Sequence, residues 1–591
     1  MLREKLVTIS EFTLLIIDEC HHTVKDDPYN NIMKIYLDKR LDASSDVSLP
    51  QIVGLTASPG MGKAKKMSQA EENIKTLMAN LDVTKAPTQV NLSTRNLKTF
   101  QNETRDQTIS ILRAPDDDFR QSISKSMDEI ETLLEKEINL HQNDLGGEIK
   151  FNLHARKGSQ DYEAWVITLR NRSKTLANDD LSHKLMMFAE HLLAYNTALV
   201  LNDHVRSSDA EDQLFELMEK YKSENPVVLR LRQIYDTNKV EPLKQVNDLL
   251  LKLHKVLLDE FSRQNDSRCI IFVRTRSIAG GVITYMEEEQ DLMKFGLNPK
   301  LLTGAGVSGD KGGMTKREQE STLGAFRQGK CKVIVATSVA EEGLDIQACN
   351  LIITYNYSTN EVGHVQRKGR GRAANSQIVT LAYDDSGHVQ KERENKIRVE
   401  LTEEMLGTIR GIPPKTLKDQ IREIQIKAKK ERDLERKIKA RLKPRKKSDE
   451  IFNLQCLWCK QHATTTQHLR HINKQHRVIV DPGFVQRAVF KTEKDPQKWK
   501  RLADDHFVTG KMFCANQCCR NHLGYRMKHK HLTLSVPKVT CFLFTDQSGS
   551  RETFEKWSQV TFKVNELNEQ DLAELLPLGN LDNEIEDVDY D

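Results

Sequence analysis

Two short runs of apolar residues near the start of the chain predict strands of a parallel sheet. Leu14–Ile17 contains four apolar residues without a turn signal, and Asp18 and Glu19 follow it directly. Such a run is typical of a strand that is buried on both faces. A second run, Ile52–Leu55, leads into Thr56-Ala57-Ser58-Pro59. The pattern predicts part of an α/β domain.

The acidic pair Asp18-Glu19 lies where open α/β sheets bind ligands, beyond the carboxyl end of a strand. Two carboxylates there can hold Mg²⁺ on a nucleotide and align the attacking water. The alternative is an edge strand capped by a solvated acidic turn, and this stretch alone does not decide between them. Thr56 and Ser58 can form hydrogen bonds with the acidic pair and so respond to a ligand bound there. Ser and Thr before Pro are, however, also ordinary turn residues.

From about residue 110 to 260, apolar residues recur at the spacing of amphipathic helices. Two such faces consist of Ile130, Leu133, Leu134 and Ile138, and of Leu185, Phe188, Leu192 and Tyr195. We predict a helical domain here. Its charged faces could bind a polyanion, but a charged helix face is usually just solvated.

Strand-like apolar runs then return and predict a second doubly wound domain. These runs are Cys269–Val273, Val333–Ala336 and Leu351–Tyr355.

A cationic segment follows the last of these runs and contains Arg367, Lys368, Arg370 and Arg372 around two glycines. Arginine side chains can bind phosphate oxygens in a bidentate manner and serve as arginine fingers. A basic loop by itself is more often a solvated or generally anion-binding turn.

The region after residue 388 is rich in Lys and Arg, and its pattern predicts long helices broken at Pro413-Pro414. The basic run 427–447 suits a helical arm that leads into a flexible linker and contacts nucleic acid, although a merely solvated linker also fits. The last residues of the chain are acidic and are predicted to be disordered.

Composition narrows the class of protein. A chain of 591 residues is too long for one core, and 38% hydrophobic with 29% charged residues is typical of a globular protein. No apolar run approaches the roughly 20 residues of a membrane-spanning helix, and no signal-peptide pattern follows Met1. Ten cysteines in such a chain indicate a reducing compartment. We therefore expect a cytoplasmic protein without membrane contact, whose paired cysteines bind metal.

Two cysteine groups predict a zinc site. Cys456 and Cys459 form a C-x-x-C pair, and Cys514 with Cys518-Cys519 offers a second pair. Two such pairs brought together give a tetrahedral Cys₄ site that stabilises a small domain. A local Cys₂His₂ finger with His471 and His476 is the alternative. It lacks the apolar residues that a finger needs between its ligand pairs, and it leaves the later cysteines without a role.

A candidate basic face follows the cysteines and consists of Arg526, Lys528, Lys530 and Lys538.

No phosphate-binding G-x-x-x-x-G-K-[ST] loop is found in the sequence. Gly60-Met61-Gly62-Lys63 is only superficially similar, because Ala57 stands where the first Gly is needed and Ala64 follows the Lys. Only 13 residues precede the first predicted strand, whereas a nucleotide-binding domain with such an acidic pair normally begins well upstream. We therefore expect the phosphate cradle to be missing from this chain.

Taken together, these segments resemble a superfamily 2 helicase, and specifically the RIG-I-like receptors, cytosolic sensors of double-stranded RNA. Asp18-Glu19-Cys20-His21 resembles their DECH box, and Thr56-Ala57-Ser58 resembles motif III. Arg274-Thr275-Arg276 is similar to motif IV, Ala336–Ile346 to motif V, and Gln366–Arg372 to motif VI. The order of these motifs, with a cysteine-bearing domain after them, carries the resemblance.

The resemblance implies an α/β fold with two RecA-like helicase domains, the first partial, a helical insertion, a helical pincer and a mostly-β zinc domain. The implied boundaries are 1–110 for the partial first helicase domain, 111–242 for the insertion, 243–388 for the second helicase domain, 389–449 for the pincer and linker, 450–575 for the zinc domain, and 576–591 for the acidic tail.

The resemblance also implies roles for single residues. In the ATP site, Asp18 and Glu19 would bind Mg²⁺ and align water, Arg370 and Arg372 would act on the γ-phosphate, and Gly343, Asp345 and Gln366 would contact the nucleotide. Thr56 and Ser58 would couple this site to RNA. The implied RNA contacts are Arg274, Thr275, Thr303, Thr337, Lys528, Lys530 and Lys538. The implied zinc ligands are Cys456, Cys459, Cys514 and Cys519, and Cys519 is preferred to Cys518 because Leu523–Met527 resembles the segment after the fourth ligand.

The implied function is that of a cytosolic innate immune sensor of viral double-stranded RNA, with RNA-dependent ATPase activity and with ATP, Mg²⁺ and Zn²⁺ as cofactors. Its expected partners are double-stranded RNA and other copies of itself or related sensors along the RNA, and a signalling adaptor only if upstream domains exist. One alternative is a truncated RNA-binding module that does not hydrolyse ATP. The other, less favoured because no nuclease acidic cluster follows the helicase segments, is the helicase region of a Dicer-type ribonuclease.

Overall fold

The computed structural model describes residues 7–42, 48–60, 62, 64, 67–85, 104–113, 117–141, 156–219, 225–240, 246–304, 314–340, 344, 346, 349–371, 373, 376–441, 447–496, 499–502, 506–529 and 532–575. The chain divides into two compact units. Unit 1 comprises Met1–Pro115, Asp203–Arg206 and Val246–Leu442. Unit 2 comprises Asp116–Asn202, Ser207–Gln245 and Lys443–Asp591.

In unit 1, the segment with the acidic pair forms a small parallel sheet covered by two helices. Strand β1 (Leu14–Ile17) pairs with β2 (Gln51–Gly54), and α1 (Pro28–Leu41) and α2 (Met67–Asn80) supply the apolar residues that pack on it. Proline in the first turn of α1 and the Asp27 carboxylate, which accepts a hydrogen bond from the backbone of Tyr29, fix where α1 begins.

The prediction that β1 is buried on both faces is wrong. Ile17 is buried in the core with α1 and α2, whereas Leu14 is 47% and Ile16 62% exposed. Side chains alternate between the two faces of a strand, and within the described residues only one face of this sheet is covered.

Unit 1 also contains a parallel sheet that has six strands within the described residues, in the order β3-β8-β7-β4-β6-β5. The three predicted runs form β4, β6 and β7, and every residue of these strands is buried, as is typical of parallel strands covered on both faces. The strands are β3 (Arg105–Ile111), β4 (Cys269–Phe272), β5 (Lys300–Leu302), β6 (Val333–Ala336), β7 (Leu351–Tyr355) and β8 (Gln377–Tyr383). The accompanying helices are α9 (Asp248–Arg263), α10 (Arg276–Glu288), α11 (Gln290–Met293), α12 (Lys316–Arg327) and α13 (Glu361–Lys368).

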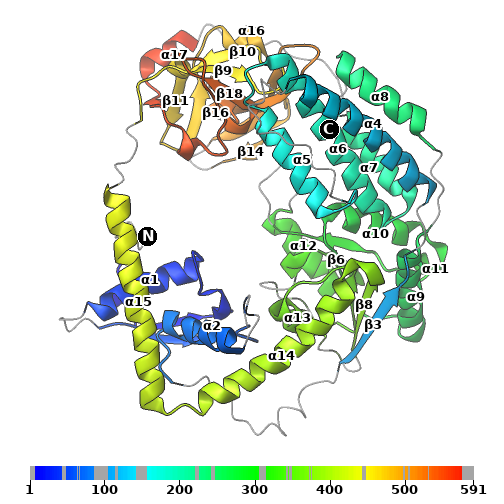
Figure 1. The fold of residues 1–591 in the computed structure, drawn as a ribbon, viewed down its shortest axis with the longest axis vertical. Coiled ribbons are helices and arrows are strands. Elements are labelled where there is room, and N and C mark those ends of the chain that lie inside the picture. The colour runs from blue at the N-terminus through cyan, green and yellow to red at the C-terminus, as the bar shows by residue number, and fades with distance from the viewer. Residues whose placement is uncertain are drawn as a thin grey trace. The chain divides into compact units, whose positions relative to one another are not determined.

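Strand β3 precedes the helical insertion in the sequence but belongs to this second sheet. It pairs in parallel with β8 along its whole length, and Figure 1 shows blue β3 beside yellow-green β8. The sequence-based boundary, which assigns residues up to 110 to the first domain, is therefore misplaced. Every residue of β3 is exposed or only partly buried, and the strand lacks the continuous apolar run that identifies β4, β6 and β7.

Two long helices follow this sheet, α14 (His388–Arg410) and α15 (Pro414–Arg441). The predicted break at Pro413-Pro414 separates them, and the residues around it pack against α2 in one apolar cluster. Farther along α15, Arg432 and Arg436 both bind the carboxylate of Asp38 in α1. Part of the basic run that we expected to contact nucleic acid is thus paired within unit 1.

In unit 2, the insertion consists of helices whose buried faces include the two predicted apolar stripes. Of the predicted residues, only Leu133 is not fully buried. The helices are α4 (Asp118–Leu140), α5 (Gln160–Ser173), α6 (Asp179–Asn202), α7 (Ser207–Glu219) and α8 (Pro226–Asn238). Side chains of Asp117, Ser159 and Asn225 cap the starts of α4, α5 and α8. Throughout the described part of the chain, no helix is both long enough and apolar enough to cross a membrane.

The cysteine-bearing part of unit 2 folds as two sheets around an aromatic core. The smaller sheet has the order β10-β9-β18-β19, and the larger has the order β13-β15-β16-β17-β12-β11-β20, with β14 paired to β15. The core includes Phe452, Phe490, Phe542, Phe544 and Phe562. The strands are β9 (Asn453–Cys456), β10 (His462–Thr465), β11 (Leu469–Ile472), β12 (His476–Ile479), β13 (Ala488–Thr492), β14 (Lys500–Arg501), β15 (Phe507–Cys514), β16 (His522–His529), β17 (Leu532–Pro537), β18 (Phe542–Thr545), β19 (Arg551–Glu552) and β20 (Asn565–Glu566).

Candidate metal centre and nucleotide-site residues

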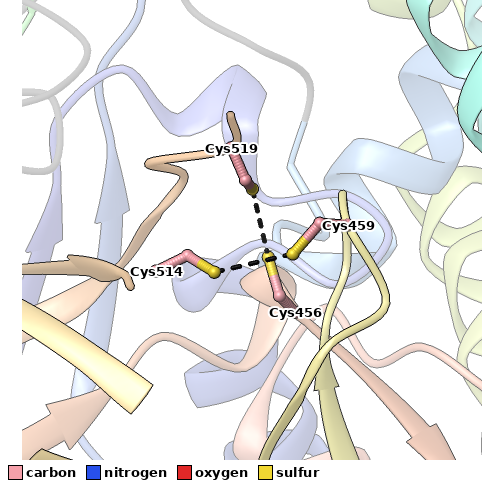
Figure 2. Close-up of side chains that lie close together, drawn as sticks. All are labelled: Cys456, Cys459, Cys514 and Cys519. Carbon is pink, nitrogen blue, oxygen red and sulfur yellow. Dashed lines mark hydrogen bonds between the residues drawn. The ribbon is translucent and has the colours of Figure 1, made fainter. Parts of the chain in front are cut away.

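Four cysteine side chains converge in the C-terminal part of unit 2. The sulfur atoms of Cys456, Cys459, Cys514 and Cys519 all lie within 4.8 Å of one another, as Figure 2 shows. The Sγ atoms of Cys456 and Cys519 are 3.7 Å apart, and those of Cys459 and Cys514 are 3.5 Å apart. These distances exclude disulfide bonds and are close to the roughly 3.8 Å between sulfurs around a tetrahedral zinc ion.

Two similar turns place these cysteines. Cys456 ends β9 and Cys514 ends β15, so the sheets fix one cysteine of each pair. The second cysteine of each pair is followed by a residue in the left-handed conformation, Lys460 (φ 58°) and Arg520 (φ 44°). This conformation is easiest for glycine, so each turn carries some backbone strain to curl its second cysteine back toward the first.

The ionisation of the cluster favours a bound cation. Hydrogen bonds from Cys459, Cys514 and Cys519 hold the pKa of Cys456 well below its usual range. The neighbouring thiols Cys456, Cys459 and Cys514, together with burial, raise the pKa of Cys519. Four thiols this close cannot all ionise without a compensating charge. A divalent cation supplies that charge, and a set of four sulfur donors suits zinc.

The competing ligand assignments do not form this cluster. Cys518 is exposed, and its amide donates to the Asn516 side chain. His471 and His476 lie on the paired strands β11 and β12, and neither belongs to the cysteine group, which is the single metal-capable group within the described residues.

The acidic pair lies at the predicted end of β1. Asp18 is exposed, and its carboxylate accepts a hydrogen bond from the amide of Glu19, which adopts a left-handed conformation with φ 48°. The Glu19 carboxylate is 3.4 Å from the His21 imidazole, which also forms a 2.9 Å hydrogen bond with the Thr56 hydroxyl. The structure thus connects Thr56 to the acidic pair through His21, a link that the sequence did not reveal.

The predicted motif VI residues lie on or just after α13. The Arg370 guanidinium donates a 2.8 Å hydrogen bond to the carbonyl of Leu344, and the Gln366 amide nitrogen is buried without a hydrogen-bond partner in the described part of the chain. Three other predicted nucleotide-site residues, Gly343, Asp345 and Arg372, lie outside the described residues.

Arg367, one of the four cations of the predicted phosphate-binding segment, is instead one of the most buried charges of unit 1. Its guanidinium donates to the Glu392 carboxylate of α14 and to the Thr359 hydroxyl, both at 2.6 Å. His364 binds the same carboxylate at 2.7 Å. Burial disfavours ionisation of Glu392, but His364 and Arg367 outweigh it and lower the pKa of this carboxyl. Helix α13 is therefore fastened to α14 by a buried ion pair, for which the sequence gives no periodic signal.

The predicted RNA contacts of unit 1 differ in accessibility. Arg274 and Thr275 are exposed before α10, where Thr275 caps the helix, and Thr337 is partly exposed after β6. Thr303 is fully buried, its amide faces the Met314 sulfur, and its carbonyl accepts from Gln319. A side chain without exposed surface cannot reach an RNA backbone, so the structure does not support this residue as an RNA contact.

The predicted basic face of the C-terminal part is partly described. The Lys528 ammonium lies 4.8 Å from the centre of the Trp499 ring, Lys538 is exposed, and Lys530 lies outside the described residues. Arg526 is buried instead, with its guanidinium 4.3 Å from the Phe490 ring centre, so it does not belong to an exposed face.

Two further lysines are exposed on the larger sheet. Lys491 of β13 and Lys511 of β15 are exposed and lie directly opposite each other, and neither forms a salt bridge within the described part of the chain. Like charges in this arrangement destabilise a sheet, so they are typical of a surface that binds an anion. Only strand pairing reveals them, because they are 20 residues apart in sequence.

Comparisons with known proteins cover most of the chain. Residues 249–374 match the helicase conserved C-terminal domain, 105–248 match the RIG-I receptor C-terminal domain, and 452–572 match the C-terminal domain of RIG-I. The chain is 31% identical to the mouse ATP-dependent RNA helicase DHX58 over 94% of this chain and 80% of that protein. It is also 31% identical to the pig antiviral innate immune response receptor RIG-I, over 96% of this chain and 60% of that receptor.

A weaker similarity links the chain to a fungal Dicer-like protein 1 from Cryphonectria parasitica, at 27% identity over 66% of this chain and 23% of that protein. This match leaves out about a third of the chain, whereas the DHX58 and RIG-I matches run through nearly all of it. The chain belongs to the RIG-I-like receptor family of RNA helicases.

Proposed function

We propose that this chain binds double-stranded RNA and acts as an innate immune sensor of it. The observation that carries the proposal is the exposed pair Lys491 and Lys511, in the region that matches the C-terminal domain of RIG-I. Lysines along a sheet bind phosphates without reading bases, which suits recognition of duplex RNA by shape and 2′-hydroxyl contacts.

The architecture proposed with this function is that of two RecA-like domains, the first partial, joined by a helical insertion. Helices α14 and α15 would form the pincer, and the C-terminal part would be a zinc domain. Cys456, Cys459, Cys514 and Cys519 would hold the zinc, which would fasten the two turns together and neutralise their thiolates.

For ATP, the proposal assigns Asp18 and Glu19 to Mg²⁺ and water, and Arg370 and Arg372 to the γ-phosphate. Gly343, Asp345 and Gln366 would contact the nucleotide. The connection from the acidic pair through His21 to Thr56 supports a role of the 56–58 segment in passing the state of this site to bound RNA.

A second candidate function is an RNA-binding module that does not hydrolyse ATP. It is favoured by one observation, the lack of a G-x-x-x-x-G-K-[ST] motif in the sequence. The chain spans 60% of the length of the RIG-I relatives, so the full activity, the cytosolic location, assembly along RNA and any signalling adaptor are proposals carried over from the family.

Binding to matched duplexes tests the main proposal. We expect tighter binding to a blunt 24-base-pair RNA duplex than to DNA of the same sequence. The double variant Lys491→Glu, Lys511→Glu should weaken RNA binding at least tenfold and lower the salt slope. Lys563→Glu is the matched control, since Lys563 pairs with Asp449 and is itself exposed. Equal affinity for RNA and DNA, or full affinity in the double variant, would refute the proposal.

ATP turnover separates the two candidates. The purified chain is incubated with ATP and Mg²⁺, with and without the RNA duplex, and phosphate release is measured. Turnover that depends on RNA and is lost in Glu19→Gln supports the ATPase. RNA binding without turnover supports the binding module.

A further inference from the structure

The turn that carries the first two cysteines packs against the helical insertion within unit 2. We define the knuckle turn as Cys456–Lys460 and the α5–α6 turn as Lys174–Asp179. The contacts between these two turns are apolar, hydrogen-bonded and ionic. None of the side chains that form them is among the residues predicted to contact RNA.

The apolar part of the contact is fully buried. Leu457 of the knuckle turn, Leu543 of β18 and Met186 of α6 form one cluster, with exposures of 5%, 0% and 1%. Trp458 packs against this cluster. Because an exposed leucine, methionine or tryptophan side chain is unfavourable in water, this cluster alone favours the docked arrangement.

A histidine on α6 forms a hydrogen bond with the backbone of the knuckle turn. The His183 Nδ1 atom lies 3.2 Å from the carbonyl of Trp458, and its Nε2 atom lies 3.0 Å from the Asn225 side-chain amide. A carbonyl only accepts, so Nδ1 carries the proton and Nε2 accepts from Asn225. The neutral ring therefore satisfies both partners, and it joins the knuckle turn to the start of α8.

Two cations of the C-terminal part bind the α5–α6 turn. The Lys460 ammonium is buried and donates to the carbonyl of Lys174, the residue that caps the end of α5, at 3.2 Å. The carbonyl end of a helix is its negative end, so a cation is favoured there. Arg551 of β19 donates to the Leu176 carbonyl at 2.5 Å and to the Asp179 carboxylate, the first residue of α6, at 2.6 Å.

The backbone of the knuckle turn suits this contact. Lys460 has φ 58°, where glycine would be strained least, yet the position carries a long side chain that reaches α5. The Lys460 side chain therefore contributes to the contact with α5, although glycine would suit the backbone conformation of the turn better.

We propose that the knuckle turn is a docking element that holds the C-terminal domain on the α5–α6 turn of the insertion, and that metal occupancy controls this docking. The control rests on the metal centre proposed above, because Cys456 and Cys459 bracket Leu457 and Trp458. When all four cysteines bind one ion, the turn is fixed in the shape that fits α5 and α6. Without the ion it loses that shape, and the domains separate.

A charge exchange tests the docking. In the full chain, Arg551→Glu and Asp179→Arg should each speed amide hydrogen exchange in the 174–183 peptide at least tenfold. The double variant should recover much of the protection, because the ion pair is restored with its charges reversed. Lys563→Glu carries the same charge change outside the contact and should leave this peptide unchanged.

Metal content separates the inference from the metal centre itself. Arg551→Glu should keep its zinc, whereas Cys459→Ser should lose zinc and also lose protection at 174–183, although this peptide contains no cysteine. Unchanged protection in Arg551→Glu overturns the docking, and a zinc-free Cys459→Ser variant that keeps protection at 174–183 overturns the metal control. A wild-type chain purified without zinc, and unable to bind it, refutes the metal centre instead.

Discussion

The four-cysteine cluster and the predicted nucleotide-site residues are built in different ways. Each half of the four-cysteine cluster is a single turn at the end of a strand, and the two turns meet within one domain. The predicted nucleotide-site residues come from the end of β1, from the segment after β2 and from α13. A site of the first kind needs two short segments to meet, whereas a site of the second kind needs several elements to be held in place at once.

The difference is visible in what supports each site. The cysteines support one another and, in our proposal, an ion. Helix α13, which carries predicted motif VI residues, is instead supported from outside by Glu392 of α14, which binds both His364 and Arg367. Damage to the first site should therefore act through its ligands, and damage to the second through residues far from any nucleotide.

The largest expected effect is at the metal centre. Cys459→Ser should abolish zinc binding and lower the free energy of unfolding of the C-terminal domain by about 5 kcal/mol or more, since structural zinc contributes roughly 10–16 kcal/mol of apparent binding energy. Metal analysis and thermal unfolding measure both quantities. Cys518→Ser and His471→Ala should keep zinc and stability. Loss of zinc in His471→Ala alone would favour the alternative Cys₂His₂ finger.

The next effect concerns the support of α13. Glu392→Ala leaves Arg367 and His364 buried without their carboxylate, which should cost about 3–5 kcal/mol in chemical denaturation. The matched control on the same helix is Lys396→Ala, whose ion pair with Asp106 is partly exposed and should contribute under about 1 kcal/mol. If both variants lose the same stability, the buried pair does not support α13 in the way proposed.

A smaller effect should follow pH. Burial, aided by the positive neighbours His204, Lys391 and Arg274 and opposed by Glu392, lowers the pKa of His388 from 6.5 to about 4. Between these values the unfolded chain binds more protons than the folded chain, so stability is complete above pH 6.5 and falls as the pH drops toward 4. At pH 5 the loss should be about 1–2 kcal/mol, allowing for partial exposure. Denaturation of His388→Gln at pH 7 and pH 5 should show a smaller difference than in the wild type.

The smallest effect is at the lysine pair. Lys511→Ala removes a like charge opposite Lys491 and should stabilise the sheet by about 0.2–1 kcal/mol. The same variant should bind duplex RNA more weakly. A variant that loses both stability and binding would show that Lys511 has a structural role.

Features set by local pattern were predictable from the sequence. The runs that form β4, β6 and β7 are continuous and apolar because both faces are covered. The cysteine pairs were recognisable because both ligands of each pair lie within one turn. The break between α14 and α15 followed from two prolines, which cannot continue a helix.

Features set by long-range pairing were not predictable. The opposition of Lys491 and Lys511 depends on strand register, and the Glu392 pair depends on how α14 packs on α13. The exposure of Leu14 and Ile16 depends on which elements cover the sheet, and the burial of Thr303 depends on how the segment after β5 packs in the folded domain. The identity of a residue in the sequence does not show which of these environments surrounds it in the folded protein.

Strand β3 has a consequence for how the protein matures. Arg105 pairs with Gln377, so the outer strand of the second sheet leaves the ribosome long before its partner exists. Until β8 is synthesised, β3 lacks its pairing strand. The whole insertion must therefore be synthesised before β3 can join the sheet. A fragment that begins after Ile111 would leave β8 as an unpaired edge, a template for pairing with other chains. Expression fragments that are meant to contain this six-stranded sheet should therefore begin before Arg105.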